Sequence, residues 1–222
     1  MVRCGFGGEA MLKLYDYMQC PFGQKARIVL AEKQLDYELV PVDLRKNEQF
    51  EAAFVEMSPF HKVPVLVDEE GADDPERIVV YDSTTIGEYL EDEYPEPALL
   101  PPAEEAADRA RIRSLEDFAD QAFVLPAGNY LTEYIKEENG DPDRLGRAKD
   151  ELDRAFFRLE RELQGGRKYL GGDLFTLADA AFAPRLLLLA GRGVELPAET
   201  RALRGYIDRL RQRESIRGLQ GI

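Results

Sequence analysis

The chain has 222 residues, 44% of them apolar and 32% charged, and its 43 acidic and 29 basic side chains give a net charge of −14. This composition indicates a globular protein, and the excess of acid opposes nucleic-acid binding, which needs clustered Lys and Arg. The longest apolar run, residues 186–190, is far too short to cross a bilayer. We therefore expect neither a nucleic acid nor a membrane among its partners.

The few cysteines and the single histidine restrict the chemistry further. Cys4 and Cys20 are too few for a disulfide framework, and His61 with two distant cysteines gives no convincing metal site or histidine-based triad. The N-terminus lacks the basic start and apolar core of a secretory signal. The sequence therefore predicts a cytoplasmic protein with reduced thiols and no metal.

The first part of the chain alternates strands and helices. Residues 1–10 are rich in glycine and are expected to form a flexible extension. A strand is predicted over residues 11–17, a helix over 21–33, a second strand over 35–42 and a polar helix over 47–57. This βαβα start predicts a parallel strand pair joined by a right-handed crossover.

Two further strands, over residues 65–67 and 78–81, are expected to form an antiparallel hairpin. Asp82 and Ser83 then begin a helix whose inner face carries Ile86, Leu90 and Tyr94 at helical spacing. Residues 11–95 are therefore predicted to form one α/β domain, in which a βαβ unit is followed by a ββα unit and the sheet is mixed.

Prolines mark a linker over residues 96–102, and residues 103–222 are predicted to form an all-helical domain. Helices are expected over residues 103–130, 143–163, 177–190 and 199–213. Pro126 is expected to kink or end the first, and Pro184 to bend the third, because proline lacks the N–H that a helix needs. Thr176 and Asp179 resemble a capping box at the start of the third helix.

The turn before the first helix carries the reactive group. Pro21 suits the first helical position, which leaves Cys20 at the N-cap, close to the positive end of the helix dipole. A thiol in that position tends to ionise near neutral pH, and the thiolate is the nucleophilic form. The third position beyond Cys20 is Gly23, not a second cysteine, so the sequence implies a mechanism with one thiol.

From about Met11 onward the chain resembles the cytosolic glutathione transferases. The motifs that carry the resemblance are Cys20-Pro-Phe-Gly with Arg27, Lys62-Val-Pro-Val-Leu, Tyr81-Asp-Ser-Thr-Thr-Ile-Gly-Glu-Tyr-Leu and Leu174-Phe-Thr-Leu-Ala-Asp-Ala-Ala. The resemblance implies a thioredoxin-like N-terminal domain, an all-α C-terminal domain, glutathione as co-substrate and a homodimer. The Cys-Pro-Phe start is similar to the omega class and its dehydroascorbate-reducing relatives.

The same resemblance assigns roles to individual residues. Cys20 would attack a disulfide or form a mixed disulfide with glutathione, and Phe22 would line the glutathione site. Pro64 would be cis, and the backbone of Val63 would pair with the cysteinyl part of glutathione. Ser83 would bind the γ-glutamyl carboxylate and Asp82 would lie near its ammonium group, or both would simply cap the helix. Lys62 either reaches the glycine carboxylate or is solvated.

Three functions follow from these motifs. The first is a thiol transferase or reductase acting through Cys20 on a disulfide substrate. The second is a transferase that conjugates glutathione to small electrophiles, in a pocket walled by the helix around Arg109 and Phe118. The third comes from a resemblance to the stringent starvation protein A group, which keeps this fold but binds RNA polymerase. That group lacks the cysteine at the first helix, so the first function is preferred.

Overall fold

The computed structural model describes residues 10–70, 77–136 and 140–219. The chain divides into two compact units, Met1–Ala98 and Leu99–Gly218, and each unit is described by itself. The expected N-terminal extension lies outside the described residues except for Ala10, which begins the first strand. No helix in the described ranges is both long and apolar enough to span a membrane.

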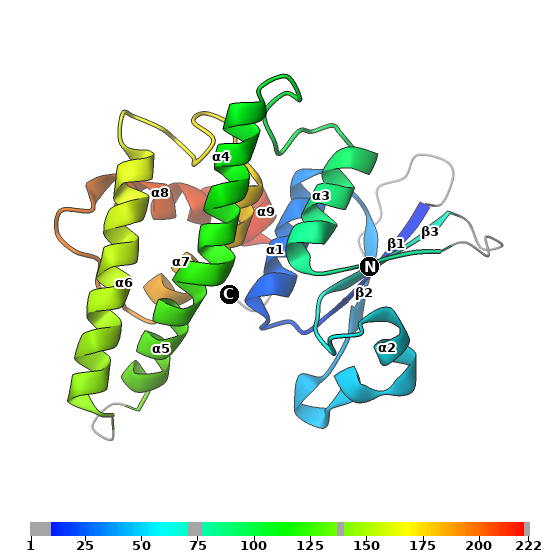
Figure 1. Ribbon diagram of the computed structural model, residues 1–222, viewed down its shortest axis with the longest axis horizontal. Coiled ribbons are helices and arrows are strands. Elements are labelled where there is room, and N and C mark those ends of the chain that lie inside the picture. Colours follow the sequence, from blue (N-terminus) through cyan, green and yellow to red (C-terminus); the bar gives the residue numbers. More distant parts are fainter. Residues whose placement is uncertain (1–9, 71–76, 137–139, 220–222) are drawn as a thin grey trace. The chain divides into compact units, whose positions relative to one another are not determined.

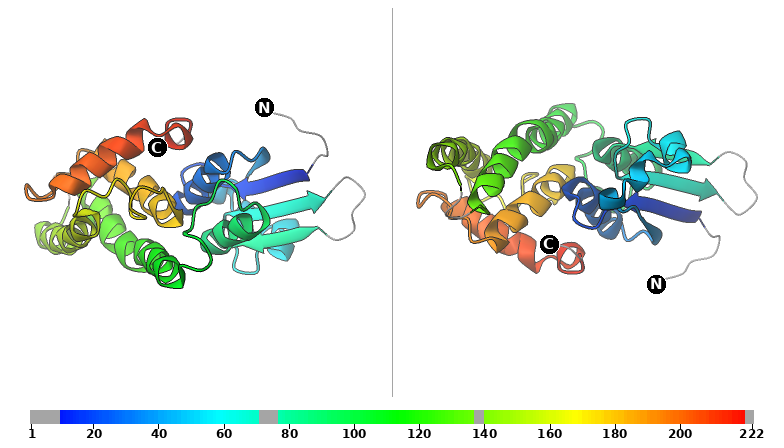
Figure 2. Two further views of the ribbon diagram at one scale, coloured as in Figure 1. Left: turned by 90° about the horizontal axis from the view of Figure 1, so that it is seen from above. Right: turned by 90° about the horizontal axis from the view of Figure 1, so that it is seen from below.

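The first unit contains a mixed four-stranded sheet, as the sequence predicts. Its strands are β1 (Ala10–Asp16), β2 (Tyr37–Pro41), β3 (Val65–Glu70) and β4 (Ile78–Tyr81), in the order β2-β1-β3-β4. The pair β1–β2 is parallel, whereas β1–β3 and β3–β4 are antiparallel. In Figure 2 the blue arrow of β1 lies beside the teal arrows of β3 and β4. The expected βαβ crossover and hairpin are both confirmed.

Helices α1 (Pro21–Glu32) and α3 (Ser83–Glu93) pack side by side (Figure 1). Ile86 and Leu90 on α3 are fully buried, which confirms the predicted inner face of this helix. Because side chains alternate along a strand, Val65 and Val67 of β3 share one face of the sheet. On that face they form a buried cluster with Phe54.

The polar helix expected over residues 47–57 is wrong in its extent. The structure has two short 3₁₀ turns, η1 (Leu44–Lys46) and η2 (Glu48–Phe50), and then the short helix α2 (Ala52–Met57). Asn47 adopts a left-handed conformation with φ 63°, and Glu51 is extended. Neither conformation fits inside an α-helix, so the segment is broken at these two residues.

The second unit is helical. Its elements are α4 (Ala106–Asp117), the π-helical segment η3 (Phe118–Phe123), α5 (Val124–Tyr134), α6 (Pro142–Leu163), α7 (Leu177–Gly191), α8 (Arg201–Gln212) and α9 (Glu214–Arg217). The expected end at Pro126 is wrong, because Pro126 is the third residue of α5 and the helix continues beyond it. The π-helical segment η3 lies just before α5.

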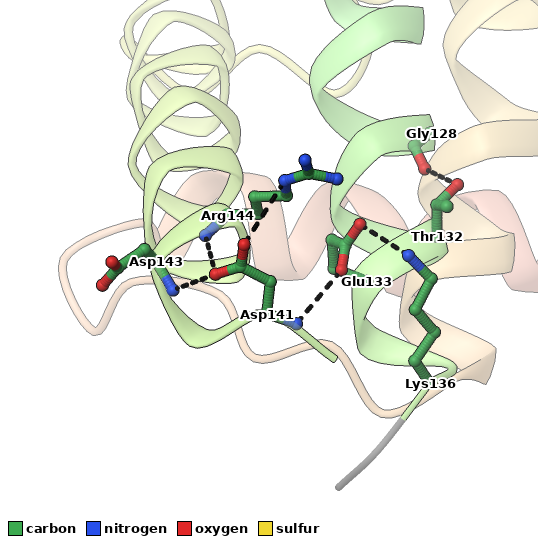
Figure 3. A network of polar contacts seen from close by, with 7 residues as sticks. All are labelled: Gly128, Thr132, Glu133, Lys136, Asp141, Asp143 and Arg144. Carbon is green, nitrogen blue, oxygen red and sulfur yellow. Dashed lines mark hydrogen bonds and ion pairs between the residues drawn. The ribbon is translucent and has the colours of Figure 1, made fainter. Parts of the chain in front are cut away.

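Acidic side chains cap the starts of α6 and α7 in the helical unit. Asp141 accepts hydrogen bonds from the N–H groups of Asp143 (3.0 Å) and Arg144 (3.2 Å) at the start of α6, while Glu133 on α5 accepts one from Lys136 (Figure 3). At the start of α7, the buried Asp179 accepts hydrogen bonds from the N–H and hydroxyl of Thr176, both at 2.8 Å. The predicted pairing of Thr176 with Asp179 is therefore present.

Asp179 also ties the start of α7 to other parts of the helical unit. It accepts hydrogen bonds from the backbone N–H of Leu170 at 2.9 Å and from the hydroxyl of Tyr206 on α8 at 2.7 Å. Burial raises the pKa of Asp179, and the four hydrogen bonds oppose that shift. Asp179 thus joins α7, α8 and the loop before α7, which is a structural role.

Candidate functional site

Three of the sequence motifs lie next to strand ends on the same side of the sheet. Val65, the first residue of β3, pairs with Tyr15 near the end of β1 and with Tyr81 at the end of β4. The chain segments just beyond these three positions therefore start at the same edge of the sheet. They are the turn 17–20, which ends at Cys20, the pair Val63 and Pro64, and the pair Asp82 and Ser83.

Cys20 occupies the N-cap of α1, as predicted. Its φ of −72° and ψ of 118° are extended, and its carbonyl accepts the first hydrogen bond of the helix, from Gln24 at 2.9 Å. Its own N–H donates to the carbonyl of Tyr17 at 2.7 Å, which closes the preceding turn. The half-buried thiol packs against the apolar cluster that contains Val63. The helix dipole favours a negative charge at this position.

The peptide bond between Val63 and Pro64 is cis, as expected. Val63 is buried, whereas Lys62 is exposed to solvent. The hydroxyl of Ser58 donates to the carbonyl of Lys62 at 2.8 Å and accepts from its N–H at 3.2 Å. These two bonds fix the backbone of the loop just before the cis bond and leave the ammonium group of Lys62 at the surface.

Asp82 is the N-cap of α3, and Ser83 is its first helical residue. The Asp82 carboxylate accepts hydrogen bonds from the N–H groups of Thr84 and Thr85 at 3.0 and 3.1 Å. These two donors are therefore already occupied by the cap. Asp82 is exposed and Ser83 is only 2% exposed.

A buried lysine links the two helix starts. The ammonium group of Lys25 on α1 donates to the hydroxyl of Thr84 on α3 at 2.8 Å, and the Lys25 side chain is fully buried. The contact holds the helix that begins after Cys20 against the helix that begins after Asp82. Sequence reasoning gave Lys25 no role, because its position in a polar stretch is typical of a solvated side chain.

The sequence also gave no role to a buried ion pair beneath the turn. Asp16, at the end of β1, and Arg27, on α1, are 0% and 2% exposed, and the Nε of Arg27 lies 3.1 Å from a carboxylate oxygen of Asp16. Burial raises the pKa of Asp16 to about 6, although the charge of Arg27 opposes this shift. The Asp16 carboxylate occupies the space where a Cβ at Gly23 would lie. The glycine after Cys-Pro-Phe is therefore required by packing.

The other residues that the sequence analysis singled out are Phe22, His61 and Cys4. Phe22 is half-buried in the first turn of α1. His61 is exposed, adopts a left-handed φ of 56° and lies with its ring 5.1 Å from that of Phe50, as expected of a loop residue. Cys4 lies outside the described residues. In the described ranges, no three His, Cys, Asp or Glu side chains gather as they would around a metal ion.

The helical unit has a cavity of its own, of about 840 Å³. Side chains of α6, α7, α8 and the loop between α7 and α8 line it, including Phe156, Leu189 and Ile207. Arg109 and Phe118, which the sequence analysis placed at a substrate pocket, lie at α4 and at the start of η3 and do not line this cavity.

Comparison with known protein families identifies both units. Residues 14–98 match the N-terminal domain of glutathione S-transferase, and residues 116–214 match its C-terminal domain. The chain belongs to the glutathione S-transferase family. The thioredoxin-like unit and the helical unit are thus those that the resemblance implied.

Individual relatives refine this placement. The chain is 34% identical to glutathione S-transferase Z1 of Arabidopsis thaliana, over 81% of this chain and 77% of the relative. It is 31% identical to maleylacetoacetate isomerase of Rattus norvegicus, over 78% and 76%. It is also 27% identical to a stringent starvation protein A homolog of Coxiella burnetii, over 94% and 91%.

A solved structure is similar over nearly the whole chain. The glutathione transferase URE2P8 of Phanerochaete chrysosporium, solved with oxidised glutathione, is 25% identical with a TM-score of 0.78, over 94% of this chain and 93% of the other. The expected superfamily is confirmed, and the similarity to stringent starvation protein A appears as well. The relatives point to the zeta class, however, and not specifically to the omega class that the Cys-Pro-Phe motif suggested.

Proposed function

We propose that the protein is a glutathione-dependent thiol transferase in which Cys20 is the nucleophile. The observation that supports this most directly is the position of Cys20 at the N-cap of α1, packed against the cluster that contains Val63. The helix N-terminus stabilises a thiolate there, and a thiolate is the species that attacks disulfides. The thiol is also half-buried rather than enclosed in the core, so a substrate can reach it.

The reaction follows ordinary thiol–disulfide exchange. The Cys20 thiolate attacks the glutathione sulfur of a disulfide between glutathione and a substrate. A mixed disulfide between Cys20 and glutathione forms, and the other sulfur leaves as a thiolate. The thiolate of a second glutathione then attacks the glutathione sulfur of the mixed disulfide. Oxidised glutathione leaves, and the Cys20 thiolate is restored. The second glutathione is necessary because Gly23 stands where a resolving cysteine would be.

The residues at the same sheet edge would hold glutathione. The backbone of Val63, set by cis Pro64, would pair with the cysteinyl part as an added strand does. The Asp82 carboxylate would face the ammonium group, and Ser83 would bind the γ-glutamyl carboxylate. Phe22 would flank the thiol. Lys62, exposed but fixed through its backbone, would reach the glycine carboxylate.

Intact-protein mass spectrometry after incubation with oxidised glutathione tests the proposal. We expect wild type and the matched control Cys4→Ser to gain one glutathionyl group and Cys20→Ser to gain none at the corresponding site. Reduced glutathione should then remove the group. Absence of an adduct on Cys4→Ser, with Cys20 titrating as a thiol in the unfolded protein, would refute the mechanism.

A second candidate is an isomerase similar to the Rattus norvegicus relative, which is favoured by 31% identity over 78% of the chain. Turnover of maleylacetoacetate by the purified protein, with and without glutathione, tests it directly. Activity retained in Cys20→Ser would favour this function, or conjugation of an electrophile, over thiol transfer. Co-purification of RNA polymerase without glutathione binding would instead favour the function of stringent starvation protein A.

We also propose that the protein is a cytoplasmic homodimer, as the family resemblance implies. Light scattering on the purified protein should give twice the chain mass of 25.2 kDa. A mass equal to that of one chain would contradict the dimer.

A further inference from the structure

The turn that delivers Cys20 is fastened to the helix that follows it. From the second turn of α1, the Nη2 of Arg27 donates to the carbonyl of Met18 at 2.7 Å, and Nη1 approaches the Met18 sulfur at 3.7 Å. The side-chain amide of Gln24, one turn closer to Cys20, donates to the same carbonyl at 3.3 Å. Two side chains of α1 therefore reach back to one residue of the turn.

The other side of the guanidinium is fixed by the sheet. Its Nε lies 3.1 Å from the Asp16 carboxylate, and Asp16 is the residue at which β1 ends. The backbone N–H of Tyr17, the next residue in the chain, lowers the pKa of the Asp16 carboxyl and offsets part of the effect of burial. The Tyr17 carbonyl in turn accepts from the N–H of Cys20 at 2.7 Å. Arg27 therefore contacts the residue before the turn, Asp16, and a residue within it, Met18. The hydrogen bond from Cys20 to Tyr17 closes the same turn.

We propose that Arg27 is the positioning residue for the thiol of Cys20. Its planar guanidinium holds the strand end and the turn carbonyl at the same time, which a lysine ammonium cannot do with the same geometry. The turn is thereby kept in the conformation that leaves Cys20 at the N-cap. This inference rests on the proposed function of Cys20 and names the residue on which the reactivity of that site depends.

The burial of these groups distinguishes positioning from a surface contact. Arg27, Asp16 and Gln24 are 2%, 0% and 3% exposed, so water cannot replace a lost contact without rearrangement. The charged and titratable groups that interact with this turn and with the ion pair beneath it include Asp16 on β1, Arg27 on α1, Tyr37 on β2, and Arg45 in η1, which interacts with Tyr17. Removing the fork of Arg27 while keeping its charge isolates geometry from electrostatics.

The test is the rate of alkylation of Cys20 by iodoacetamide as a function of pH, measured in the Cys4→Ser background. For Arg27→Lys we expect the midpoint of the rate profile to move toward that of an ordinary thiol, with a roughly tenfold lower rate below the midpoint. The matched control is Arg185→Lys, because Arg185 forms a comparable buried ion pair with Asp120 at 3.2 Å in the helical unit. It should lower stability without moving the profile.

The outcomes separate the two proposals. A profile of Arg27→Lys that superimposes on that of the parent protein would overturn the positioning role and leave Cys20 as the nucleophile. An equal shift in Arg185→Lys would show that the effect is general destabilisation, and would also overturn it. If the parent protein itself titrates as an ordinary thiol, the proposed function fails first, and the positioning role fails with it. Urea unfolding of each variant confirms that the assays are made on folded protein.

Discussion

Gly23 offers a sharp test of the packing around the candidate site. In the substitution Gly23→Ala, the new Cβ would overlap the carboxylate of Asp16. That carboxylate cannot simply turn aside, because it is buried and lies 3.1 Å from the Nε of Arg27. Either the ion pair separates or α1 moves away from the end of β1. Both adjustments would disturb the turn that carries Cys20.

The cost follows from the size of the overlap. An extra methylene in a well-packed site costs about 1–3 kcal/mol, and a methyl group that meets a fixed carboxylate belongs at the upper end of that range. Replacing glycine by alanine within a helix otherwise gains about 1 kcal/mol. We therefore expect Gly23→Ala to lower the free energy of unfolding by about 2 kcal/mol. Gly146→Ala on α6, where nothing lies within 4 Å of the new Cβ, should raise it by about 1 kcal/mol.

The assay is urea unfolding followed by circular dichroism, on a double-mutant cycle with Asp16→Ala. Without the carboxylate, the methyl group at position 23 has room, so Gly23→Ala should become neutral or stabilising in that background. The two effects should therefore be strongly non-additive. An equal cost of Gly23→Ala in both backgrounds would refute the reasoning, because the contact with Asp16 would then not be its cause.

Three further predictions follow from the described contacts. Because burial raises the pKa of Asp16 from 3.8 to about 6, the folded state holds a proton that the unfolded state has lost between these values. Wild-type stability should therefore fall relative to Asp16→Asn as the pH rises from 4 to 7, by up to about 3 kcal/mol in urea unfolding. Asp82 has φ 74° and caps α3, so Asp82→Ala should cost about 1–2 kcal/mol and Asp82→Gly only a few tenths. Tyr206→Phe removes the 2.7 Å hydrogen bond to buried Asp179 and should cost about 1.5–3 kcal/mol.

Each of these predictions has an outcome that contradicts it. A constant difference between wild type and Asp16→Asn across that pH range would show that the Asp16 pKa is not raised. Equal stability of the alanine and glycine variants at position 82 would show that the left-handed backbone carries no cost for a side chain. Full stability of Tyr206→Phe in thermal unfolding would mean that the other three donors suffice for Asp179.

The sequence by itself determined the order and type of the main elements. The apolar and aromatic enrichment of β1, the alternation of β2 and the helical spacing of α3 are local patterns, and they correctly predicted strands, helix faces and the mixed sheet. Pro21 predicted the start of a helix, with Cys20 at its N-cap, because proline is favoured at the first helical position. The motif of Lys62 to Pro64 likewise indicated the cis peptide, through the family resemblance rather than through any physical pattern.

The tertiary structure decided the features that depend on residues distant in the chain. That Gly23 must lack a side chain follows from Asp16, a residue on another element, and no spacing rule connects the two. The burial of Lys25 depends on Thr84, which is 59 residues away. Asn47 interrupts the expected polar helix because its backbone is left-handed. An asparagine tolerates that conformation but does not require it. Local patterns report which face of an element is apolar, whereas only the packed structure shows which polar groups meet across elements and exclude water together.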